Sequence, residues 1–348
     1  MNTGGQTRWA ASPWLKFALS VTIAVTIFTL LFSNVTWEEV KGMILGMNRQ
    51  ALLVFFGLSL TMNILRTVRY RLVLKVAGHV PGAVPLFLVV LVRGLFVDLL
   101  PARLGELVYI YLLKTRLKVP LGTATASFAL AFLFDIVALA PLVFVAALFV
   151  EPLAEVPVAW LVGGGVVLLA ASGGVIFAMP CLLRTAYWVL SGKYAVGIRA
   201  GRALADFVAA TDFQIRKARR AGIFWHLLGI SLLVRVSKYS ALYVLFFAMT
   251  SPMGYTLADL PVPKLFFGLC SAELAASLPI SGIAGFGVYE GTWAMVFTLL
   301  GFPQKIAILT SISHHLFTQL YGYALGTGAL VLLFLPSIHR RLRRAVSS

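Results

Sequence analysis

Several ionisable side chains in this sequence lie inside long apolar runs, where a charge needs a partner or a function. Arg103 and Glu106 are three residues apart, so they share one face if this segment is helical, and Asp98 lies just before them. This spacing allows either an ion pair that only holds the segment together or a polar cavity that receives a phosphate group. We expect the cavity, in which Glu106 positions Arg103 for an anion.

A second set of charges occurs closer to the C-terminus. Arg235 and Lys238 are also three residues apart and lie near the middle of an apolar run, too deep for their side chains to reach the membrane surface easily. We therefore expect a second anion site on this helix face. The alternative is that both cations pair with carboxylates, namely Glu273, Glu290 or Asp135, only so that the chain can be inserted.

Titratable groups in apolar runs also suggest proton transfer. Burial favours the neutral form of a carboxylate, so Glu273 and Glu290 are candidates for counter-charges or proton carriers. Asp135, His314 and His315 are candidates for a proton relay, although only one of two adjacent histidines can face a cavity and a hydrogen-bonded core histidine is the common alternative. No residue spacing is typical of a metal site, and neither a cofactor motif nor a nucleophilic triad is predicted.

The elements that must position these charges are membrane helices. Of the 348 residues, 60% are hydrophobic and 12% are charged, and the mean hydropathy of +0.94 excludes an ordinary soluble protein. Long uncharged runs favour helices over the alternating pattern of a barrel strand. The net charge of +17 is explained by basic residues kept on the cytoplasmic side rather than by nucleic-acid binding, because no basic stripe with interleaved aromatic residues is present.

The sequence predicts an all-α polytopic membrane protein with about six full spans and two re-entrant helical hairpins, all within a single membrane domain over 1–348. The predicted spans are 17–37, 50–75, 119–150, 156–183, 221–250 and 306–338. Lys and Arg clusters at the ends of the second and last spans place both termini in the cytoplasm, with the protein integral to the plasma (inner) membrane. The basic segment 184–220 is expected to be a cytoplasmic helical segment at the membrane surface.

Two apolar segments are too broken to cross the membrane. Segment 81–118 begins and ends on the cytoplasmic side, and segment 264–305 begins and ends outside, so each is predicted to be a re-entrant hairpin. Residues that permit sharp turns and close packing mark the predicted tips: Pro101, Gly105, Pro279, Gly282, Gly285 and Gly287.

The order of span, span, hairpin and span occurs twice, over 14–150 and 156–338, in opposite orientations, which predicts an inverted repeat. Short local matches support it, since Arg66-Thr67-Val68-Arg69-Tyr70 is similar to Arg235-Val236-Ser237-Lys238-Tyr239. Arg66 and Arg69 lie nearer the cytoplasmic end of their span, so we expect them at the membrane interface.

Two motifs carry a resemblance to a known family. Leu99-Leu100-Pro101-x-Arg103-x-Gly105-Glu106, with Pro279-x-Ser281-Gly282 and Gly285-x-Gly287-x-x-Glu290-Gly291, resembles the lysylphosphatidylglycerol synthase transmembrane (flippase-like) family over most of the chain. The resemblance implies an integral membrane lipid translocase without the soluble aminoacyl-transferase domain of bacterial multiple peptide resistance proteins. Asp98 and Tyr109 depart from the family pattern, which has Asn and a basic residue there, so both are candidates for changing the accepted headgroup.

These observations favour a translocase that moves an anionic or zwitterionic phospholipid, or a polyprenyl-phosphate-linked lipid, across the bacterial inner membrane. The alternative is a membrane-embedded enzyme or accessory factor that acts on a lipid-linked phosphate or sugar, with Glu106 or Glu290 as acid or base. A scaffold that binds a partner through 184–220 ranks last, because it leaves the buried charges unexplained.

The candidate substrate-binding residues are Asp98, Arg103, Glu106, Arg235, Lys238, Glu273 and Glu290. The expected partners are membrane lipids, a second copy of the chain and a separately encoded protein of lipid biosynthesis, with no nucleic acid and no cofactor.

Overall fold

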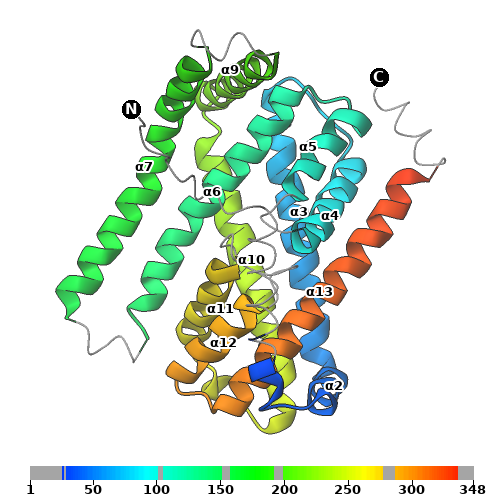
Figure 1. Cartoon of the computed structure of the whole chain (residues 1–348), viewed down its shortest axis with the longest axis vertical. Helices are drawn as coiled ribbons and strands as arrows, with labels where there is room; N and C mark the ends of the chain where they lie inside the picture. Colours follow the sequence, from blue (N-terminus) through cyan, green and yellow to red (C-terminus); the bar gives the residue numbers. More distant parts are fainter. Residues whose placement is uncertain are drawn as a thin grey trace, which may run out of the picture.

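The computed structural model describes residues 26, 29–100, 105–150, 157–191, 199–276 and 287–335, and every regular element in these ranges is a helix (Figure 1). The helices are α2 (Trp37–Leu45), α3 (Arg49–Val76), α4 (Ala83–Leu99), α5 (Gly105–Arg116), α6 (Leu121–Ala147), α7 (Val158–Leu190), α9 (Arg199–Arg220), α10 (Phe224–Thr250), α11 (Val262–Ala276), α12 (Val288–Leu299) and α13 (Gln304–Phe334). Two short 3₁₀ helices, η3 (Ser251–Met253) and η4 (Leu257–Asp259), follow α10. The prediction of an all-helical polytopic membrane protein is confirmed.

Four of the described helices are long and apolar enough to cross a membrane: α3, α6, α13 and α10 together with η3. They correspond to four of the predicted spans. Helix α7 runs for 33 residues and overlaps the predicted span 156–183, but the apolar segments found in its described residues, Val162–Gly174 and Cys181–Leu190, are each shorter than a full span. The first predicted span, 17–37, lies largely outside the described residues.

Helix α9 forms most of the predicted surface segment 184–220, although α7 takes the beginning of that segment because it continues to Leu190. One face of α9 buries Ala205, Val208, Ile215 and Ala218, and the helix packs on α6 and α7. Its last turn carries Lys217, Arg219 and Arg220. This division between an apolar face and a basic end is typical of a helix that lies along a membrane surface.

The two segments predicted as hairpins each form a pair of short, packed helices, α4 with α5 and α11 with α12. Figure 1 shows the first pair in the upper half of the molecule and the second in the lower half. These helices have 17, 12, 15 and 12 residues, so the longest measures only ~25 Å, shorter than the ~30 Å hydrocarbon layer. The predicted tip residues Pro101, Pro279, Gly282 and Gly285 and the candidate binding residue Arg103 lie outside the described residues.

Glycines allow the close approach that this packing needs. A Cβ added at Gly105 would lie 2.1 Å from backbone atoms of Phe96 and Val97, so α5 can approach α4 only without a side chain there. At Gly326 an added Cβ would lie 2.3 Å from the Leu95 Cβ, which explains the tight contact of α13 with α4. Gly287, the residue just before α12, has φ +94°, a backbone conformation that would be strained for a residue with a side chain.

The long helices α3 and α10 pack against each other along the middle of the molecule. Helix α13 packs on α4 and α12, while α6 packs on α11 and α5. Each short helix pair is therefore in contact with long helices from both halves of the chain, and charged side chains from the two halves can meet.

Candidate functional site

Asp135 on α6 joins three helices through two arginines. Arg69 on α3 donates from Nη1 to Asp135 Oδ1 at 2.6 Å and from Nη2 to Oδ2 at 3.1 Å, and its Nη1 also donates to Ser231 Oγ at 2.8 Å. Arg235 on α10 donates from Nε to the Asp135 backbone carbonyl at 3.2 Å. Arg69 is only 1% exposed, so the expectation that it lies at the membrane interface is wrong. Asp135, predicted as part of a proton relay, is instead held by two cations.

A second ion pair closes the first helix pair. Arg93 on α4 donates from Nε and Nη2 to the two carboxylate oxygens of Glu106 on α5, each at 2.5 Å. The sequence suggested Arg103 as the partner of Glu106, and Arg103 lies outside the described residues. Arg93 and Glu106 are 13 residues apart, so the spacing rules for neighbours on one helix could not predict that they pair. They meet because α5 folds back onto α4.

Tyr109, which departs from the family pattern, lies one helical turn from Glu106 and is fully buried. Its ring centroid lies 4.5 Å from that of Tyr70 on α3, and its hydroxyl shares a hydrogen bond of 3.1 Å with Ser127 Oγ on α6. Tyr109 therefore fixes α5 against its neighbours.

Lys238 on α10 forms an ion pair with Glu273 on α11, and the Tyr239 hydroxyl donates to the other Glu273 oxygen at 2.8 Å. This is the pairing that the sequence offered as the alternative to a free anion site. The side chains of both ions are nonetheless about a quarter exposed, at 25% and 23%, so they border open space.

Glu290 on α12 is fully buried and accepts two hydrogen bonds. One carboxylate oxygen accepts from the Gly287 backbone N–H at 2.7 Å, and the other lies 2.5 Å from His315 Nδ1 on α13. His314 faces elsewhere, with its Nε2 3.2 Å from the Leu242 carbonyl oxygen. The two adjacent histidines therefore differ, and only His315 joins a carboxylate.

Two partly exposed ions among these residues form no ion pair within the part of the chain that the structure describes: Arg66 on α3 and Asp98 at the end of α4. Arg66 interacts electrostatically with Arg93, Asp135 and Arg235, and Asp98 with Lys238, Arg66 and His315. The sequence placed Arg66 at the membrane interface, whereas the structure brings it into this charged region.

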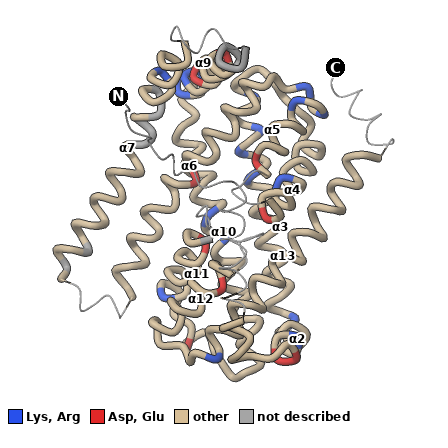
Figure 2. The backbone as a smooth tube through the Cα atoms, viewed as in Figure 1, with Lys and Arg blue, Asp and Glu red and all other residues tan. Residues whose placement is uncertain are grey.

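We call these residues the central cluster: Arg66, Arg69, Arg93, Asp98, Glu106, Asp135, Arg235, Lys238 and Glu273. They come from α3, α4, α5, α6, α10 and α11. Figure 2 shows charges at mid-height, between the two short helix pairs, while most of the length of the surrounding helices is uncharged. The arrangement suits the binding of a charged group by ionic hydrogen bonds.

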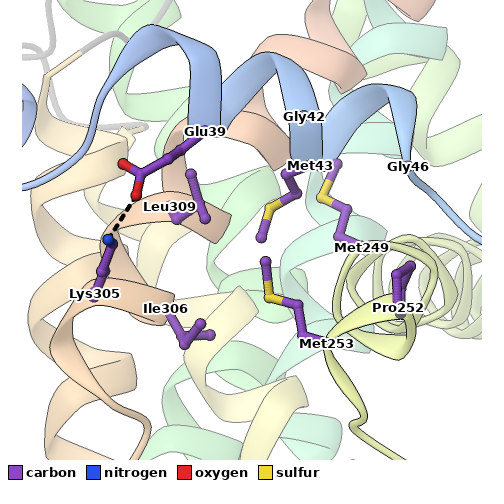
Figure 3. Close-up of a pocket in the computed structure, with 10 residues that line it drawn as sticks. All are labelled: Glu39, Gly42, Met43, Gly46, Met249, Pro252, Met253, Lys305, Ile306 and Leu309. Atoms are coloured by element: carbon purple, nitrogen blue, oxygen red, sulfur yellow. Dashed lines mark ion pairs between the residues drawn. The ribbon is translucent and has the colours of Figure 1, made fainter.

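A separate cavity of about 360 Å³ lies at the C-terminal end of α10 (Figure 3). No residue of the central cluster lines it. Three methionines, Met43, Met249 and Met253, line it from α2, α10 and η3. An ion pair of 2.6 Å between Lys305 Nζ and a Glu39 carboxylate oxygen lies at its edge. The hydrogen bond from Lys305 and the backbone hydrogen bond from Thr36 lower the pKa of Glu39 from 4.5 to about 2.

Among the described residues no group of three or more His, Cys, Asp or Glu could hold a metal ion. The fold and the central cluster define a helical integral membrane protein with a polar site among its spans. Residues 14–326 match the family described as the lysylphosphatidylglycerol synthase TM region, and the chain belongs to this family. Comparison with curated proteins found no match.

Proposed function

We propose that this protein is a lipid translocase that moves an anionic or zwitterionic lipid, either a phospholipid or a polyprenyl-phosphate-linked lipid, between the leaflets of the bacterial inner membrane. Its headgroup would enter the central cluster while its acyl or prenyl chains remain in the bilayer. The family name supports a substrate of this kind, since it refers to the membrane region of proteins that act on a phospholipid.

The observation that carries the proposal is the pair of ions without an ionic partner in the described residues, Arg66 and Asp98. An unpaired charge inside a membrane protein is unfavourable by several kcal/mol, so a site that keeps one gains by binding a counter-charge. Arg66 and Arg235 suit a phosphate, because guanidinium groups donate to phosphate oxygens in a fixed geometry. Asp98 suits the amine of a zwitterionic headgroup.

We also propose that the chain is an inverted repeat, which would allow alternating access. Exchanging α2, α3, α4, α5 and α6 with α9, α10, α11, α12 and α13 converts the helix contacts into one another. The α3–α4 contact becomes α10–α11, α4–α13 becomes α11–α6, α5–α6 becomes α12–α13, and α2–α13 becomes α9–α6. A fold that is related to itself in this way has two similar states, in which the central site opens to either side.

The orientation follows from charge. The basic last turn of α9 and the Lys114 and Arg116 end of α5 lie at the same end of the molecule (Figure 2), which we assign to the cytoplasm by the positive-inside rule. The cavity beside Glu39 would then face the periplasm.

The test is a translocation assay in sealed vesicles that contain the purified protein and headgroup-labelled phosphatidylglycerol or phosphatidylethanolamine. A membrane-impermeant reductant removes the label from the outer leaflet only, so continued loss reports translocation. Substitution of both Arg66 and Arg235 by Gln removes charge-assisted hydrogen bonds of about 1.5–3 kcal/mol, and we expect the rate to fall about tenfold or more.

The matched control is Arg71→Gln, which removes an exposed cation from the same helix α3 and should leave the rate unchanged. Equal rates in the wild type and the Arg66/Arg235 double variant would contradict the assigned site. Absence of translocation for every labelled lipid tested, with folded protein in the vesicles, would contradict the proposed function.

The alternative, a membrane-embedded enzyme with Glu106 or Glu290 as acid or base, gains no support from the geometry. Glu106 is bound by Arg93 through both oxygens, and Glu290 uses its two oxygens on Gly287 and His315.

A further inference from the structure

A row of polar residues on α13 connects Glu290 with the central cluster. His315, Gln319 and Gly322 are spaced at i, i+4 and i+7, so they lie on one face of this helix. His315 Nδ1 lies 2.5 Å from Glu290, and His315 Nε2 lies 2.9 Å from Gln319 Nε2. One turn further along, a Cβ added at Gly322 would lie 3.4 Å from Asp98 Oδ2. The Asp98 carboxylate therefore lies against the same face of α13.

The Glu290–His315 pair differs chemically from the four ion pairs described in the central cluster. Those pairs use arginine or lysine, which keep their protons at neutral pH. An imidazole gains or loses a proton within the physiological range. Among the buried ion pairs described, the Glu290–His315 pair is thus the one that contains an imidazole.

Gln319 is suited to both protonation states of His315. The side-chain amide has an N–H₂ donor and a carbonyl acceptor, so it can donate to the neutral imidazole and, after rotation, accept from the charged one. The contact at 2.9 Å is therefore compatible with proton gain and loss at His315 Nε2.

The pair is also placed where its protonation would affect the fold. Glu290 caps the first turn of α12 by accepting from Gly287 N–H, and it binds α13 through His315. A proton added to His315 strengthens its contact with Glu290, because the hydrogen bond then joins an imidazolium cation to a carboxylate. Proton binding would thus bias how α12 packs on α13.

The other titratable and charged groups around the pair come from every helix packed near it. They are Tyr289 on α12, whose ring centroid lies 4.3 Å from that of His315; His314 on α13; Glu273 on α11; and Asp98 on α4, which itself interacts with Lys238, Arg66 and Arg93. Lys238 already pairs with Glu273, and Arg93 with Glu106. Asp98 is thus the carboxylate in this set that can exchange a proton with His315 without first breaking an ion pair seen in the described residues.

We propose that Glu290 and His315 form a proton-binding site that is loaded from the central cluster through Asp98, and that proton movement is coupled to lipid translocation. The proton leaves the Asp98 carboxyl group, passes through water molecules along the roughly two helical turns of α13 between Gly322 and His315, and is taken by the His315 imidazole. Asp98 becomes an anion, and His315 becomes a cation paired with Glu290. A proton and a cationic headgroup then compete for Asp98, which gives the coupling its physical basis. This inference rests on the proposed function.

Two measurements test it with the full-length protein. First, infrared difference spectra between about pH 5 and 8 should show an imidazole band that titrates in the wild type and is lost in His315→Asn. Second, the translocation assay should respond to a pH difference across the vesicle membrane, because one pH unit shifts a proton-coupled equilibrium up to tenfold. We expect the wild-type rate to change severalfold.

His315→Asn and Glu290→Gln should lose this response to the pH difference, whatever their basal rates. His314→Asn is the matched control: it removes the neighbouring buried histidine, which contacts the Leu242 carbonyl instead, and should keep the response. Translocation that ignores the pH difference in the wild type would overturn the coupling but leave the proposed function intact. Identical titration of the imidazole bands in the wild type and in His315→Asn would overturn the proton site even if no lipid moved.

Discussion

Arg69 and Asp135 are 66 positions apart in the sequence, yet the guanidinium of one donates two hydrogen bonds to the carboxylate of the other. The pair joins α3 to α6, and Ser231 on α10 accepts a further hydrogen bond from Arg69. Three long helices thus meet at one buried charge pair, which fixes their positions around the central cluster.

Asp135→Leu alone should leave Arg69 buried and unpaired, and breaking such a pair is expected to destabilise the protein by about 3–5 kcal/mol. Arg69→Met combined with Asp135→Leu removes the Arg69–Asp135 pair and should recover part of that loss, because Arg235 still lacks the Asp135 carboxylate. Thermal unfolding of the detergent-purified protein measures the difference. If the double variant is as unstable as the single one, the pair does not act as a unit.

Exchanging the charges of Arg93 and Glu106 tests the closure of the first helix pair. Either single substitution, Arg93→Glu or Glu106→Arg, places like charges at a buried contact of 2.5 Å and should prevent accumulation of folded protein. The double exchange restores opposite charges and should raise the yield again. Gel filtration of a fluorescent fusion measures the folded fraction, and a double variant no better than the singles would show that the pair lacks this role.

Gly326 and Gly328 lie on the same helix but should respond oppositely to alanine. A methyl group at Gly326 would meet the Leu95 Cβ at 2.3 Å, so Gly326→Ala should destabilise the contact of α13 with α4 by about 1–3 kcal/mol. Nothing lies within 4 Å of a Cβ at Gly328, and Gly328→Ala should be neutral or stabilise by up to about 1 kcal/mol. The melting temperatures of the two variants, each compared with the wild type, test this difference. Equal changes in melting temperature would contradict the close packing at Gly326.

Glu39 should make the attachment of α2 to α13 sensitive to acid. Its pKa is lowered in the folded protein from 4.5 to about 2 by Lys305 and Thr36, so its stabilising effect is complete above about pH 4.5 and is lost as the pH falls towards 2. Trp37, exposed on α2, provides a fluorescence signal for this change. In Lys305→Met the transition should move to higher pH, towards 4.5, and an unchanged midpoint would contradict the ion pair.

The sequence alone determined the membrane class, the position of the long apolar helices, the two short helix pairs and the family. These features depend on local composition, because a span needs about 20 apolar residues in a row and a hairpin needs breaks that no span tolerates. The sequence also included Glu273 among the partners considered for Lys238, and Asp135 among those for Arg235. The sequence could not say which carboxylate pairs with which of these cations, because each candidate carboxylate lies in an apolar run and needs a partner equally.

Only the tertiary structure decided which charges meet. Arg93 reaches Glu106 because α5 folds back on α4, and Arg69 is buried, not interfacial, because α3 packs its charged face against α6 and α10. The same packing turned His315 towards Glu290 and His314 towards Leu242, one residue apart. Helix rotation and close approach set these contacts, and both depend on side chains far away in the sequence, which local spacing does not contain.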